Sequence, residues 1–157
     1  LLGGGAISDA WHMSAPDPTG EGARRAMRAA LQSASVDAAS IGWLNLHGTG
    51  TPHNDAMESH ATHAVFPNGV PCASTKPLTG HTLGASGAIE AALCWILLAE
   101  NPQQQLPPHW WDGVADPALP ALPLVAPATF LQQLPRRVLS NSFAFGGSNA
   151  VLALERR

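Results

Sequence analysis

The sequence predicts an α/β fold: a mixed, mostly parallel sheet covered by helices, with a hairpin at its C-terminal end. Three observations support this fold class. Apolar runs of strand length alternate along the chain with segments of helical periodicity. Glycine-rich or proline-rich turns separate these segments. The last two strand-like runs are joined by the short turn GGS, which is typical of a hairpin.

The first third of the chain contains a strand, a helix and a second strand. The opening stretch LLGGGAISDAW is strand-like, and because no initiator methionine precedes it we expect a fragment of a longer protein. A helix is predicted from Gly20 to Ala34, with Thr19 as its N-cap, because small and apolar residues recur on one face and arginines lie mostly on the other. The apolar run from Ile41 to His47 has the length of a strand buried on both faces.

The later elements are bounded by proline and glycine in the same way. They are a helix from His53 or Asn54 that ends before Pro67, a brief strand at 71–75, a helix from about Gly84 to Glu100, and hairpin strands at 136–145 and 149–157. Residues 101–127 are rich in proline, glutamine and tryptophan and are predicted to form a long surface connection.

Composition excludes several classes of protein. The chain is 45% hydrophobic with a formal net charge of −3, which indicates one globular domain and no nucleic-acid partner. The apolar run 88–99 is interrupted by Glu90 and is too short to cross a bilayer; with no leader at the start, a cytoplasmic location is expected. Cys72 and Cys94 have no CxxC spacing, so both are interpreted as buried structural residues.

Three loops at predicted strand ends carry unusual sequences. HGTGTP follows Leu46, KPLTGHTLGASG follows Thr75, and the late hairpin reads NSFAFGGSN. Because loops at the carboxyl ends of strands gather at one edge of an open α/β sheet, we expect His47, Lys76 and His81 to converge. A single histidine or lysine there is more often structural or solvated, so the combination carries the hypothesis. The glycine spacings fit neither a dinucleotide loop nor a GxSxG elbow.

Together these motifs resemble those of the β-ketoacyl-acyl carrier protein synthases, the elongating condensing enzymes of the thiolase superfamily. HGTGTP followed by Asp55 and Glu58, STKPLTGHTLGASGAIEA, and NSFAFGGSNA occur in the order typical of that family, and the similarity extends back to SDAWHMSAPDPTGEGARRAM. The resemblance implies a thiolase-like fold built from two similar α/β halves. Residues 1–157 match only the C-terminal half.

The resemblance also implies a role for each motif residue. His47 and His81 correspond to the paired catalytic histidines, Lys76 to the lysine that organises them, and Glu90 to the acidic residue that holds this lysine. The remaining site residues share contact with substrate: Thr49 and Thr51 with the pantetheine arm, Phe145 as gate and oxyanion-hole amide, and Gly146 and Gly147 as positions of close approach. No metal is implied.

The implied activity is a 3-oxoacyl-acyl carrier protein synthase of fatty acid or polyketide-like synthesis, working by decarboxylative condensation of malonyl carrier protein with an enzyme-bound acyl chain. The family nucleophile is a cysteine of the first half, so this chain alone is expected to be inactive. No dissociable cofactor is implied beyond the phosphopantetheine of acyl carrier protein. The expected partners are that carrier, the missing N-terminal half, and a second full-length chain in a homodimer or heterodimer.

Two other classes of function stay open from the sequence. A non-catalytic partner of a condensing enzyme, acting on chain length or as a scaffold, keeps the fold but typically loses the histidines. A metal-binding module is the second, because His53, His60 and His63 recur at helical spacing with Asp55 and Glu58 nearby. A solvated helix face explains this second pattern more simply, since no cysteine ligand accompanies it.

Overall fold

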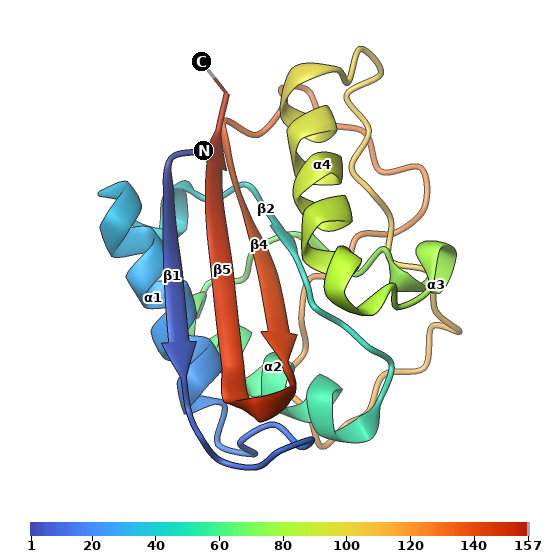
Figure 1. The fold of residues 1–157 in the computed structure, drawn as a ribbon. Coiled ribbons are helices and arrows are strands. Elements are labelled where there is room, and N and C mark those ends of the chain that lie inside the picture. The colour runs from blue at the N-terminus through green and yellow to red at the C-terminus, as the bar shows by residue number, and fades with distance from the viewer. Residues whose placement is uncertain (157) are drawn as a thin grey trace.

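The computed structural model describes residues 1–156 as a five-stranded sheet between two layers of helices. Figure 1 shows α1 and α2 on one side of the sheet and α4 on the other. The strands are β1 (Gly3–Ser8), β2 (Trp43–Asn45), β3 (Cys72–Ala73), β4 (Arg137–Ala144) and β5 (Ser148–Glu155). The helices are α1 (Glu21–Ala34), α2 (Pro52–Val65), α3 (Lys76–Thr79) and α4 (Ser86–Ala99), with short 3₁₀ turns η1 (Ala38–Ser40), η2 (Leu83–Ala85) and η3 (Phe145–Gly147).

The sheet is mixed, as predicted, but its parallel part is smaller than expected. Its order is β1-β5-β4-β2-β3. The pairs β4–β2 and β2–β3 are parallel, whereas β1–β5 and β5–β4 are antiparallel. Parallel pairs were expected to predominate, but they make up only half of the strand pairs. The reason is that the opening strand joins the outer edge of the terminal hairpin, with Gly3 opposite Ala153.

Alternating side chains of the strands build two separate cores. Leu44, Leu139 and Val151 face α1 and α2, where helix residues such as Met27 complete the cluster. Trp43, Val138 and Leu154 face α4 and its Cys94 and Leu97. Neighbouring residues of β2 thus enter opposite cores, which confirms the prediction that this strand is buried on both faces.

The N-cap of α1 differs from the prediction. Gly20, not Thr19, is the N-cap, with φ 67° and no capping bond from a side chain. Thr19 lies one residue earlier, and its hydroxyl accepts from the backbone N–H of Glu21 at 3.3 Å. A Cβ at position 20 would lie 3.0 Å from the carbonyl oxygen of Met57 in α2, so close helix packing and a left-handed backbone both favour glycine there.

Other boundaries moved by a few residues. Helix α2 begins at Pro52, with Thr51 as the N-cap accepting from the N–H of Asn54, slightly before the expected start. Helix α4 begins at Ser86, because 83–85 forms a 3₁₀ turn, and α3 was not predicted.

The long connection is not purely a surface segment. Much of it is exposed, but Leu106 and Val125 are buried in the core under α4. Leu124 also forms a parallel bridge with Cys72, so the connection extends the sheet beyond β3. None of the helices in residues 1–156 combines the length and apolar character needed to cross a membrane.

Candidate active site

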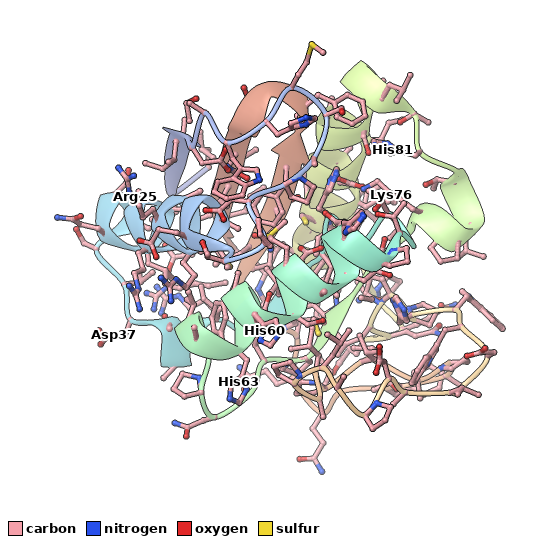
Figure 2. All side chains as sticks on the ribbon, turned by 90° about the horizontal axis from the view of Figure 1, so that it is seen from below. Arg25, Asp37, His60, His63, Lys76 and His81 are labelled. Atoms are coloured by element: carbon pink, nitrogen blue, oxygen red, sulfur yellow. The ribbon has the colours of Figure 1, made fainter. Side chains whose placement is uncertain are left out.

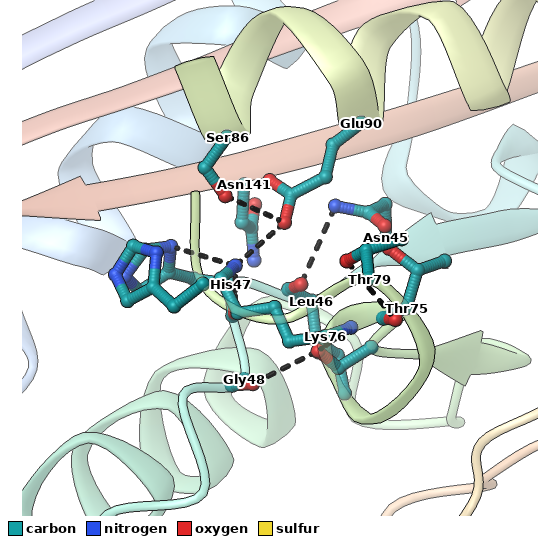
Figure 3. Close-up of polar contacts among 12 residues, drawn as sticks. Asn45, Leu46, His47, Gly48, Thr75, Lys76, Thr79, Ser86, Glu90 and Asn141 are labelled. Carbon is teal, nitrogen blue, oxygen red and sulfur yellow. Dashed lines mark hydrogen bonds and ion pairs between the residues drawn. The ribbon is translucent and has the colours of Figure 1, made fainter. Parts of the chain in front are cut away.

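The carboxyl ends of β2, β3 and β4 bring the three motif loops together. His47 follows β2, Lys76 opens α3 after β3, and Phe145 follows β4 directly. The ring centroids of His47 and His81 are 5.3 Å apart, nearly perpendicular. Lys76 Nζ lies 3.4 Å from His47 Nδ1. The predicted convergence of these three residues is therefore found in the structure, and Figure 3 shows His47 beside Lys76.

Lys76 is a buried cation with fixed partners. Its side chain is 5% exposed, and Nζ donates to Glu90 Oε1 of α4 at 2.6 Å. It also donates to the backbone oxygen of His47. Ser86 Oγ donates to the same Glu90 oxygen at 3.1 Å. Since a buried charge is stable only when paired, Glu90 and the His47 carbonyl hold the lysine beside the imidazole. The expected proximity of Glu90 and Lys76 is thus present.

The lysine also determines which nitrogen of His47 carries the proton. An ammonium group has donors only, so His47 Nδ1 must accept and the proton of the neutral ring lies on Nε2. Burial, then the charge of Lys76, then His81 lower the pKa of His47 to about 3. The ring is therefore neutral throughout the physiological range and presents an N–H donor.

His81 reaches the same tautomer by another route. It lies in the exposed loop between α3 and η2, where the backbone N–H of Leu83 donates to its Nδ1 at 3.3 Å. The neutral ring then carries its proton on Nε2, as His47 does. Within residues 1–156, neither Nε2 has a hydrogen-bond partner. Two donor nitrogens on adjacent rings are suited to hold an oxygen that gains negative charge.

Glu58 of α2 fixes the loop that carries His47, and sequence reasoning gave it no such role. The backbone N–H groups of His47 and Gly48 donate to its two carboxylate oxygens, each at 2.8 Å. Asn141 Nδ2 of β4 donates at 3.0 Å. Burial raises the pKa of Glu58, and these donors act in the opposite direction. The available signal was a charged residue beside Met57 on the buried face of a helix, where it needs partners.

The remaining predicted residues lie in the loops that follow β2 and β4. The hydroxyl oxygens of Thr49 and Thr51 are 2.9 Å apart, and Thr51 also caps α2. Phe145 lies at the start of η3 and is 71% exposed. Gly146 and Gly147 both have φ 74°. A Cβ on Gly147 would meet Asp9 Oδ1, so this glycine permits the loop to pack on the segment after β1.

The histidines of α2 do not assemble a metal centre with the acidic residues near them. No group of three or more His, Cys, Asp or Glu side chains that could hold a metal ion occurs in the described part of the chain. Figure 2 shows His60 and His63 on α2, away from Lys76 and His81. Glu58, named with them in the metal hypothesis, instead binds backbone amides of the His47 loop.

Comparison with known proteins gives a consistent result. Residues 1–110 match the family described as beta-ketoacyl synthase, C-terminal domain. The chain is 36% identical to 3-oxoacyl-[acyl-carrier-protein] synthase 2 of Synechocystis sp., with 99% of this chain aligned to 37% of that protein. It therefore spans little more than a third of the length of such relatives.

Solved structures show the same similarity over the whole chain. A ketosynthase from Xenorhabdus doucetiae, solved in complex with its chain length factor, is 51% identical with a TM-score of 0.91; the match covers 100% of this chain and 39% of that one. A structure described as a type II polyketide synthase acyl-carrier protein with its ketosynthase bound to the hexaketide is 28% identical with a TM-score of 0.84, covering 100% and 38%.

Proposed function

Because this chain belongs to the β-ketoacyl synthase family, as its C-terminal domain, we propose that the complete protein is a 3-oxoacyl-acyl carrier protein synthase. It joins malonyl carrier protein to an enzyme-bound acyl chain with loss of carbon dioxide, in fatty acid or polyketide-like synthesis. The observation that carries the proposal is the pair of adjacent rings, His47 and His81, in each of which Nδ1 accepts a hydrogen bond and Nε2 is left free to donate. Their retention disfavours a non-catalytic partner subunit.

The histidines act in the extension step of this proposal. The bond from malonyl C2 to its carboxylate carbon breaks, carbon dioxide leaves, and the electron pair passes into an enolate of the thioester. The two Nε2–H groups donate to the enolate oxygen without carrying charge themselves. The nucleophilic carbon then attacks the enzyme-bound acyl carbonyl and expels the cysteine thiolate. Burial, and after it the charge of Lys76, keeps His47 neutral, and Lys76, paired with Glu90, sets the required tautomer.

The nucleophile is proposed to lie in the rest of the protein. A condensing cysteine must ionise easily to accept an acyl chain. Burial raises the pKa of Cys72 and of Cys94 to about 12, so both thiols stay protonated. Cys72 sits in β3 and Cys94 inside α4, and both are buried. The role that fits them is packing, as the sequence predicted.

The proposed partners follow from exposed features. Thr49 and Thr51 bind the pantetheine arm of acyl carrier protein. This phosphopantetheine is the only organic group that the reaction requires. The outer face of α4 exposes Ile89, Trp95 and Ile96, which suits docking of the N-terminal half. A homodimer or heterodimer of complete chains and a cytoplasmic location complete the proposal; known relatives have been solved with a chain length factor and with a carrier protein.

The direct test is chain extension by the complete protein. Acyl carrier protein loaded with radiolabelled acyl groups, together with malonyl carrier protein, is expected to give a 3-oxoacyl product and one carbon dioxide per turnover. Mass spectrometry of the carrier identifies the product, and trapping measures the gas. Tight binding of both carriers with neither carbon dioxide nor product would contradict the proposal and favour a scaffold subunit.

Phe145 is expected to gate acyl loading. Its side chain is exposed, and the left-handed Gly146 and Gly147 that follow it allow the loop to move with little strain. Phe145→Ala in the complete enzyme is expected to slow ordered acyl loading about tenfold, with little change in melting temperature because the ring is not in the core. Unchanged loading together with a clearly lower melting temperature would make Phe145 a packing residue instead.

A further inference from the structure

The imidazole of His109 takes the place of a backbone carbonyl at the edge of the sheet. Beside β3, the N–H of Cys72 donates to the oxygen of Pro123 at 3.1 Å, and the N–H of Val125 donates to the oxygen of Cys72 at 2.9 Å. The next donor of this ladder, the N–H of Ser74, instead meets His109 Nδ1 at 3.1 Å. The Val125 oxygen is occupied by the N–H of His109 itself, at 2.8 Å.

Ser74 connects this histidine to both catalytic loops. The residue is 1% exposed. Its hydroxyl donates to the carbonyl oxygen of Gly48 at 2.8 Å, directly after His47, and accepts from the N–H of Lys76 at 3.3 Å. A change in the position of Ser74 would therefore act on the backbone beside both His47 and Lys76.

We propose that His109 is a positioning residue for the catalytic pair: its Nδ1 accepts from Ser74, and Ser74 holds the His47 loop and Lys76 in register. The proposal rests on the function proposed above. It assigns the long connection after α4 a part in catalysis, because His109 belongs to that connection and not to any of the three motif loops.

The contact requires the neutral ring of His109. A protonated imidazole has donors at both nitrogens, so Nδ1–H would oppose the Ser74 N–H and the bond would be lost. Burial lowers the pKa of His109, while the Asp55 carboxylate of α2 acts in the opposite direction. Because the folded-state pKa is depressed, the contact is intact at neutral pH and is lost as pH falls through the folded value.

The test compares two substitutions in the complete enzyme. In His109→Asn, the amide Oδ1 stands two bonds from Cβ, as Nδ1 does, and accepts without titrating. His109→Ala removes the acceptor. His109→Ala is expected to lower kcat for carbon dioxide release about tenfold at neutral pH, with KM for malonyl carrier protein changed less than about twofold, because one hydrogen bond to a buried donor is lost. His109→Asn is expected to keep most of the wild-type rate. Because asparagine does not titrate, the rate of this variant should fall less than that of the wild type as the pH is lowered.

The control is His60→Asn, an exposed histidine of α2 that makes no described contact with the site; it should leave the rate and the pH profile unchanged. A purely structural His109 would lower the melting temperature in both variants without separating their pH profiles. Equal loss in His109→Ala and His109→Asn, or no loss in either, would overturn the proposal.

A second measurement does not depend on activity. Hydrogen exchange followed by mass spectrometry on the peptide containing Ser74, at one pH, is expected to be about tenfold faster in His109→Ala than in the wild type, whereas His109→Asn stays protected. If the wild-type enzyme released no carbon dioxide, the proposed function would fail, and the exchange comparison would still decide whether His109 holds Ser74. Equal exchange in all three proteins would refute the contact.

Discussion

Replacing His47 or His81 with alanine in the complete enzyme is expected to slow carbon dioxide release from malonyl carrier protein by about 10²-fold or more, the scale for losing one preorganised donor to an oxyanion. Each ring has a single donor nitrogen facing away from its protein partners, because Lys76 and the Leu83 N–H occupy the other nitrogen. Removing either ring leaves one donor for the enolate oxygen.

Acyl loading is expected to suffer less from the same substitutions. Its oxyanion is expected to be held by backbone amides, the role that the family resemblance implies for that of Phe145, and not by the imidazoles. Radiolabelled acyl carrier protein measures loading, and trapped carbon dioxide measures decarboxylation. His60→Ala, on the exposed face of α2, is the matched control. If His81→Ala abolished loading but left decarboxylation intact, His81 would be a base that activates the cysteine, and the donor role would be wrong.

Purified residues 1–157 are expected to show no condensation activity. Cys72 and Cys94 are both buried with pKa values raised to about 12, so the chain offers no reactive thiolate. The measurement is product formation from acyl and malonyl carrier proteins, with the complete enzyme as positive control. Chain extension by the isolated segment would overturn both the assignment of the nucleophile and the division into halves.

The isolated chain is also expected to self-associate. Helix α4 has the sequence SGAIEAALCWILLA, in which apolar residues lie both on the side that meets the sheet and on the side that faces away from it. Ile89, Trp95 and Ile96 remain exposed on the other side. Sedimentation velocity should therefore detect oligomers that decrease in Trp95→Ser, while the matched surface change Phe130→Ser, in the segment before β4, leaves them unchanged. A monomer at all concentrations would argue against a docking role for this face.

The site was more predictable than the sheet that supports it. His47, Lys76 and His81 follow runs of strand length within glycine-rich loops, and parallel strands must bring such loops to one edge. The partner of β1 was not predictable, because its pairing with β5 links opposite ends of the chain and leaves no local signal. Leu106 and Val125 were hidden for a related reason: single apolar residues in a proline-rich segment show no periodicity.

Side chains that bind backbone groups of the site could not be predicted from the sequence either. Glu58 binds two amide hydrogens of the His47 loop, and His109 accepts from the Ser74 amide. Backbone amides are the same at every position, so sequence gives no indication of which side chain will meet them. The N-cap at Gly20 depended likewise on the position of a carbonyl in α2, which only tertiary packing defines.

The pairing of β1 with β5 also bears on the order in which this domain is synthesised and folded. Gly3 is made before Ala153 but can be paired only after Ala153 has emerged from the ribosome. Until then β1 has no neighbour, since β5 is the strand that separates it from β4. Contacts this remote in sequence carry a high loop-closure cost and delay folding. Until β5 has been made, the growing polypeptide therefore exposes an unpaired strand and the side of α1 that packs on it.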